Sequence, residues 1–110
     1  MSFEVYSIPV FEKQTKRLGR KYPSLKKDLA ILIDQLSQNP VIGTPLGKGF
    51  YKVRLSISSK GKGKSAGARV ITYVKITETA VYLSYIYDKS QKSTIAESEL
   101  EELLRQFQDN

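Results

Sequence analysis

Three segments in the second half of the chain alternate between apolar and polar residues with the period of a β-strand. Phe50 to Ile57 alternates strictly, with Tyr51, Val53, Leu55 and Ile57 on one side and Lys52 and Arg54 on the other. Ala68 to Ile76 is a second such segment, and Val81 to Tyr87 is a third that is aromatic on both sides. A polar, glycine-rich tract and a short turn connect the three. The pattern therefore predicts an antiparallel β-meander.

The remaining segments have other periodicities. Phe3 to Ile8 alternates like a short strand, and Val10 to about Arg20 has the pattern of a weakly amphipathic helix. A second helix is predicted from Ser24, a plausible N-cap, to the break at Asn39-Pro40. Its inward face is predicted to consist of Leu25, Leu29, Leu32, Ile33 and Leu36.

The chain between the second helix and the meander, Val41 to Gly49, is rich in proline and glycine and is expected to be a loop. Thr94-Ile95-Ala96-Glu97 has the form of a capping box and predicts a last helix that extends to about Phe107. The expected fold is therefore α+β, in the order β-α-α-β-β-β-α, with an antiparallel sheet packed against helices. With 110 residues, the chain is expected to form a single domain over residues 1–110.

Basic residues dominate the middle of the chain. From Gln35 to Thr77 there is no aspartate or glutamate. The same stretch carries Lys48, Lys52, Arg54, Lys60, Lys62, Lys64, Arg69 and Lys75. A field of one sign opposes compaction, and the formal net charge of +7 favours a polyanionic partner over an acidic small metabolite. The charge pattern therefore predicts binding to nucleic acid or another anionic surface.

The composition also limits the chemistry. The chain has no cysteine and no histidine, which excludes a zinc-thiolate site, a thiol nucleophile and the most common general base. We expect no metal and no cofactor. The only apolar stretch near the N-terminus contains Glu4, and no run of eighteen apolar residues occurs. The expectation is a cytoplasmic protein with no membrane partner.

Several segments together resemble a known family. They are Tyr51-Lys52-Val53-Arg54-Leu55, Ala68-Arg69-Val70-Ile71-Thr72-Tyr73 and Tyr82-Leu83-Ser84-Tyr85-Ile86-Tyr87-Asp88-Lys89, with a glycine-lysine loop at 60 to 67. In this order they resemble the RelE/ParE superfamily of toxins from bacterial type II toxin–antitoxin pairs. The loop makes the chain most similar to the RelE-like HigB toxins.

The resemblance implies an mRNA interferase, which is an endoribonuclease that cuts messenger RNA on the ribosome, near 16S rRNA, and that a cognate antitoxin protein holds inactive. Lys52 and Arg54 fall where the family has two basic residues, and Arg69 falls on its next-strand arginine. Some members then place an arginine and a tyrosine after the last strand. Here that region offers Lys89, Ser90, Lys92 and Ala96, so the general acid stays unassigned.

The chemistry of RNA cleavage assigns roles to the same three residues. Attack by the 2′-hydroxyl needs a base, donors for the charge on the phosphorane, and an acid for the leaving 5′-oxygen. Arg69 suits the second role, because a guanidinium presents a planar fork to two phosphate oxygens. Lys52 is a candidate for the base or for a further electrostatic clamp beside Arg54.

A second group of residues is predicted to bind RNA. Tyr73 and Tyr87 are the tyrosines best placed to stack on unpaired bases, although strand tyrosines also commonly pack in a core. The loop lysines form a flexible electrostatic arm or an ordinary hairpin tip. The predicted RNA-binding residues are Lys60, Lys62, Lys64, Tyr73, Tyr87, Lys89 and Lys92.

Three functions follow from the sequence. The first is a toxin that cleaves messenger RNA and inhibits translation. The second is a ParE-like inhibitor of DNA gyrase, and the third is a non-catalytic, nucleic-acid-binding relative. The fold alone does not choose among them. The oligomeric state is not predicted.

Overall fold

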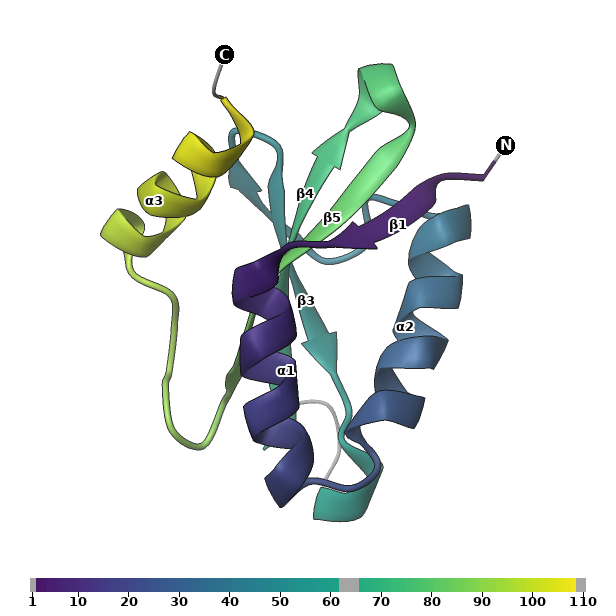
Figure 1. Ribbon diagram of the computed structural model, residues 1–110, viewed down its shortest axis with the longest axis vertical. Coiled ribbons are helices and arrows are strands. Elements are labelled where there is room, and N and C mark those ends of the chain that lie inside the picture. The colour runs from purple at the N-terminus through teal and green to yellow at the C-terminus, as the bar shows by residue number, and fades with distance from the viewer. Residues whose placement is uncertain (1, 62–65, 109–110) are drawn as a thin grey trace.

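A computed structural model describes residues 2–61 and 66–108 as an open β-sheet with helices on both faces (Figure 1). The elements are β1 (Glu4–Ser7), α1 (Pro9–Lys21), α2 (Leu25–Gln38), β2 (Thr44–Gly47), β3 (Phe50–Leu55), β4 (Ala68–Lys75), β5 (Ala80–Asp88) and α3 (Glu97–Phe107). Short 3-10 turns follow β3 and β4. This is the predicted α+β class. No helix in these two ranges is long and apolar enough to cross a membrane.

The five strands lie in the order β1-β5-β4-β3-β2. β3, β4 and β5 pair antiparallel with their chain neighbours, which confirms the predicted meander. β1 runs parallel to β5, with Val5 opposite Val81. The first strand of the chain is therefore held by the last one.

The prediction that residues 41–49 form only a loop is wrong, because this segment contains β2. Thr44 pairs with Lys52 and Pro45 with Tyr51, and the register shifts between Pro45 and Gly47. Proline cannot donate to a sheet, so it is confined to edge strands such as this one. A four-residue edge strand with a proline and a glycine shows no alternation, which is why the sequence pattern does not reveal it. The observed order is β-α-α-β-β-β-β-α.

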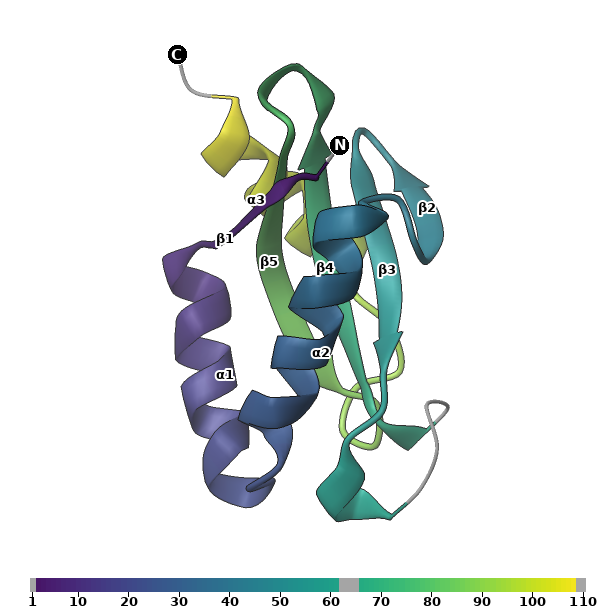
Figure 2. The same cartoon turned by 90° about the vertical axis from the view of Figure 1, so that its right-hand side faces the viewer.

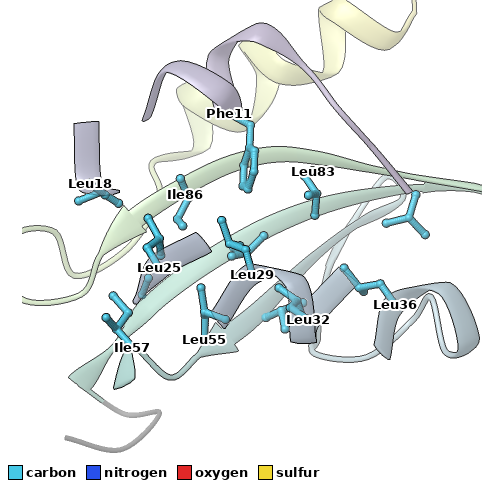
Figure 3. Packing of buried hydrophobic residues seen from close by; sticks show 14 of the residues in the cluster. Phe11, Leu18, Leu25, Leu29, Leu32, Leu36, Leu55, Ile57, Leu83 and Ile86 are labelled. Atoms are coloured by element: carbon cyan, nitrogen blue, oxygen red, sulfur yellow. The ribbon is translucent and has the colours of Figure 1, made fainter. Parts of the chain in front are cut away.

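The sheet separates two apolar cores. α1 and α2 cover one face, where Phe11, Leu29 and other helix residues pack on strand residues such as Leu55 and Leu83 (Figure 3). α3 covers the other face, where Leu103 joins a smaller cluster from β3, β4 and β5. Figure 2 shows β3, β4 and β5 beside α1 and α2 in side view. Because successive strand residues point to opposite faces, each central strand contributes to both cores.

The last helix begins later than the capping box predicts. Thr94 is not its N-cap, because Ile95 is buried in the smaller core and the chain stays extended through Ala96. Glu97 is the first helical residue. The Glu99 carboxylate accepts a hydrogen bond of 2.8 Å from the Ala96 N–H, so Glu99 takes the role predicted for Glu97.

Three smaller expectations also change. Ile33, predicted to face inward, is 37% exposed beside an open apolar groove between α1 and α2. Ile76 lies in the turn after β4, 63% exposed, and not in the strand. Ser24 does occupy the N-cap position of α2, but its hydroxyl donates to the Asp28 carboxylate and caps no helix N–H.

Gly43 allows the loop after α2 to lie directly against β3. Its φ is +101°, and a Cβ there would collide with the backbone carbonyl oxygen of Lys52. We expect Gly43→Ala to lower the free energy of unfolding by about 1–3 kcal/mol, measured by urea denaturation. Gly19→Ala is the control, because a Cβ at this helical site meets no atom within 4 Å. It should raise stability by about 0.5–1 kcal/mol, and equal effects would contradict the argument.

Candidate nucleic-acid interface

Lys52, Arg54 and Arg69 lie on the same face of the sheet. Their neighbours Val53, Leu55, Ala68 and Val70 belong to the core under α1 and α2. Strand alternation therefore points the three basic side chains to the opposite face, on which α3 packs. The predicted convergence of these residues on adjacent strands agrees with the register of the sheet.

The register places two arginines directly opposite each other. Arg54 on β3 pairs with Arg69 on β4, and Arg69 pairs in turn with Tyr87 on β5. Directly opposite residues have Cβ atoms about 4.5–5.5 Å apart, and like charges in such a pair are destabilising. The register therefore brings two positively charged side chains to directly opposite positions on β3 and β4.

The three basic residues differ in exposure. Arg54 is exposed and Lys52 is half-buried, and both line a hollow of about 560 Å³ at the edge of β3. Arg69 is only 5% exposed and does not line this hollow. One of its guanidinium nitrogens donates to the Ala68 carbonyl at 3.2 Å. The residues thus share a face and a register row but not one open pocket.

Lys60 belongs to a buried network around Asp88. Its Nζ donates to the Asp88 carboxylate at 2.8 Å and to the Ala66 carbonyl at 2.7 Å. The Tyr22 hydroxyl donates to the other carboxylate oxygen at 2.6 Å, and Ser90 donates to Asp88 from its N–H and its hydroxyl. Although burial opposes ionisation, these donors hold the pKa of Asp88 well below its ordinary value. The network ties both ends of the glycine-lysine loop to the end of β5.

Tyr87 is buried beside the arginine row. It is 5% exposed, and burial raises the pKa of its hydroxyl, while the positive charge of Arg69 partly offsets this rise. The ring belongs to the core under α3. Tyr87 therefore keeps its proton at neutral pH and presents no open ring face in this conformation.

Lys92 lies in a cluster with Tyr85 and Glu99. Its Nζ and the Tyr85 hydroxyl both donate to the Glu99 carboxylate at 2.8 Å. The ion pair with Lys92 is the main reason that the pKa of Glu99 is lowered. Lys92 also lies over the Tyr85 ring, 5.8 Å from its centroid. The cluster fixes the start of α3 against β5.

The other predicted RNA-binding residues lie apart from one another. The Tyr73 ring stacks on Phe107 of α3, with centroids 4.2 Å apart, and contacts Phe50. The Lys89 Nζ donates to the Ser93 carbonyl at 3.1 Å. Lys62 and Lys64 lie outside the described residues. RNA binding by Lys60, Tyr73, Tyr87, Lys89 and Lys92 stays a prediction, and the contacts above give each a structural role.

Sequence reasoning missed the two acidic residues that organise this region. Asp88 gathers donors from Tyr22 and Lys60, which are far away in the chain, and Glu99 gathers donors from the nearer Tyr85 and Lys92. The available signal was that Asp88 is an isolated carboxylate at the end of an otherwise uncharged strand. Within residues 2–61 and 66–108, no three acidic side chains come together in a way that could hold a metal ion.

Comparison with known proteins agrees with this architecture. The sequence model of the family described as the RelE toxin of the RelE/RelB toxin–antitoxin system matches residues 9–108. The fold is similar to an arginine double mutant of E. coli RelE in the free state, with a TM-score of 0.65 and 15% identity over 96% of this chain and 98% of that one. It is also similar to isolated E. coli RelE, with a TM-score of 0.61 and 16% identity over 94% and 98%.

Proposed function

The chain belongs to the RelE toxin family, and from this membership we propose that it inhibits translation by cleaving messenger RNA on the ribosome. As a toxin of this family it has a cognate antitoxin as its protein partner. To family membership the proposal adds messenger RNA as the substrate, the ribosome as the place of cleavage, and the residues that take part in the reaction. A cytoplasmic location follows from that setting.

One observation carries the proposal. Arg54 lies directly opposite Arg69, Lys52 lies two residues along the same strand, and no carboxylate lines the hollow that Lys52 and Arg54 share. Within the described ranges, Lys52 and Arg54 form no ion pair. Cations that protein carboxylates do not neutralise are suited to bind phosphates.

The proposed chemistry is transfer of the scissile phosphate to the neighbouring 2′-hydroxyl of the RNA. Arg54 and Arg69 stabilise the phosphorane more than the bound phosphodiester, because the phosphorane carries the larger negative charge. Lys52 holds the adjacent backbone or takes the proton of the 2′-hydroxyl. RNA is proposed to approach this row from the side of Arg54, its exposed member, because Arg69 is buried.

Tyr87 is the group best placed to give a proton to the leaving 5′-oxygen. It is the register neighbour of Arg69, and burial keeps its hydroxyl protonated. A proton donor at the strand position next to that of Arg69 is therefore the candidate for the general acid. The assignment adds this chemical role to the predicted RNA-binding role of Tyr87.

Mapping the 5′ ends of messenger RNA after induction of the toxin in bacteria tests the proposed function. We expect new ends within translated codons, in phase with the reading frame, that disappear when translation initiation is blocked. The Arg54→Ala, Lys52→Ala double variant should reduce these ends at least about tenfold, because it removes both accessible cations. Growth arrest with intact messenger RNA and broken DNA would instead indicate gyrase inhibition and refute the proposal.

A further inference from the structure

The part of β5 that carries Tyr87 is held by α1 through a side-chain hydrogen bond. We propose that Gln14 is a positioning residue for RNA cleavage, which fixes the end of β5 so that Tyr87 reaches the leaving 5′-oxygen. The inference rests on the proposed function, in which Tyr87 is the general acid. It adds a residue of α1, a helix on the opposite face of the sheet.

A β-bulge changes the way β5 faces along its length. Thr72 of β4 pairs with Leu83 of β5, but the preceding residue of β4 pairs with Tyr85. Ser84 is therefore an extra residue in the ladder. Leu83 packs in the core under α1 and α2, whereas Tyr85 and Tyr87 pack in the core under α3. In a regular strand all three would share one face, so the bulge is what turns Tyr87 to the face of the arginine row.

The outer edge of β5 loses its strand neighbour at the bulge. The pairing with β1 ends where Ser7 lies opposite Leu83. Ser84 is fully buried, and its hydroxyl donates to the Tyr82 carbonyl at 3.0 Å. Within residues 2–61 and 66–108, no strand pairs with this edge of β5 after Leu83. The backbone groups of the segment that carries Tyr87 therefore need partners from elsewhere.

Gln14 supplies an acceptor at this edge. The Ile86 N–H donates to the Gln14 side-chain Oε1 at 2.9 Å, across 72 positions of the chain. Phe11 and Leu18 lie three residues before and four after Gln14, and both are buried in the main core (Figure 3). This spacing places Gln14 on the inward side of α1. A glutamine on that side is suited to satisfy a strand N–H that would otherwise lack a partner.

This hydrogen bond acts on the residue next to Tyr87. Beside it lies a hollow of about 220 Å³, which Gln14, Tyr85 and Tyr87 help to line. Because the hollow adjoins the strand here, close packing does not fix this edge of β5. A shift of the Ile86 backbone therefore moves Tyr87 relative to Arg69, its register neighbour. A misplacement of about 1 Å in a reacting group lowers a rate by as much as about 100-fold.

An RNA with sulfur in place of the leaving 5′-oxygen tests the role of Gln14. A thiolate leaves without protonation, because a thiol is a much stronger acid than an alcohol, so cleavage of this RNA needs no general acid. The cut position is first mapped with an unmodified synthetic messenger RNA on bacterial ribosomes. The oxygen and sulfur forms are then bound to ribosomes, and single-turnover cleavage rates are measured for each protein.

We expect Gln14→Leu to slow cleavage of the oxygen form about 10- to 100-fold but to cleave the sulfur form within about threefold of the wild-type rate. Tyr87→Phe should behave in the same way, because both changes impair protonation of the leaving atom. Arg69→Ala should stay slow on both forms, because its role does not depend on the leaving atom.

Three further variants complete the design. Gln14→Glu keeps an acceptor oxygen at the same reach and should cleave both forms at close to the wild-type rate. Gln14→Asn, whose amide ends one methylene short of the strand, should match Gln14→Leu and takes its place if that protein does not fold. Gln38→Leu makes the same replacement at an exposed position of α2 and should leave both rates unchanged.

A wild-type rate of Gln14→Leu on the oxygen form overturns the inference. So does a loss that sulfur does not restore, because it would indicate a general structural defect. If sulfur fails to restore Tyr87→Phe, the general-acid role of Tyr87 falls together with the role of Gln14, while cleavage of messenger RNA stands. A wild-type protein that cuts neither form refutes the nuclease proposal itself.

Discussion

Replacing Arg69 with alanine should reduce the rate of messenger-RNA cleavage about 100- to 1,000-fold and abolish growth arrest. The expected size is that of removing one preorganised donor from the developing charge of a transition state. Arg69 is the buried member of the arginine row, so its guanidinium acts where water is scarce and charge interactions are strong. Mapping the 5′ ends of messenger RNA and measuring cleavage rates in a translating bacterial extract will report the loss of activity.

Two variants control the Arg69 experiment. Arg20→Ala removes an exposed arginine of α1 on the far side of the sheet and should leave cleavage unchanged. Arg69→Lys keeps the charge but loses the planar fork, so its rate should lie between those of the wild type and the alanine variant. Full cleavage by a folded Arg69→Ala protein, with a wild-type melting curve, would remove Arg69 from the proposed mechanism.

Replacing Asp88 with alanine should destabilise the protein by about 3 kcal/mol, a fall of about 15 °C in the melting temperature. The change leaves the Lys60 ammonium without its carboxylate, and the side chain of Lys60 is only 11% exposed. It also frees the Tyr22 hydroxyl. Asp34→Ala is the matched control, because this exposed carboxylate of α2 has no described partner, and it should change stability by less than about 0.5 kcal/mol.

The same network predicts a dependence of stability on pH. The pKa of Asp88 is lowered in the folded protein, so on acidification the unfolded chain takes up the proton first. The contribution of Asp88 is complete above its ordinary pKa of 3.8 and declines by about 1.4 kcal/mol for each pH unit below it. Urea denaturation of the wild type and Asp88→Asn should show a shallower acid slope for the variant. Parallel slopes would contradict the assignment.

Local periodicity was enough to predict most of the fold. The alternation around Val53 and Val70 defines two central strands, and their separation by one loop makes antiparallel pairing the simplest arrangement. The parallel pairing of β1 with β5 and the short strand β2 could not be predicted in this way. Both depend on contacts between distant segments, and Pro45 removes the local signal of a strand.

The sequence predicted which basic residues share a face of the sheet, but not their burial or their tertiary contacts. Strand alternation correctly places Lys52, Arg54 and Arg69 on one face, and the register then puts the two arginines opposite each other. Arg69 is only 5% exposed, and the burial of one strand residue depends on tertiary packing that no local pattern encodes. The engagement of Lys60 with Asp88, 28 positions away, is likewise a tertiary contact.

The parallel pairing of β1 with β5 has a consequence during synthesis. Residues 4–7 can find their partner only after residues 80–83 have been translated and have left the exit tunnel, so the nascent chain carries an unmatched strand for most of its translation. The row that joins β3, β4 and β5 is likewise incomplete until β5 emerges. A ribosome therefore synthesises nearly the whole polypeptide before the five-stranded sheet can be completed.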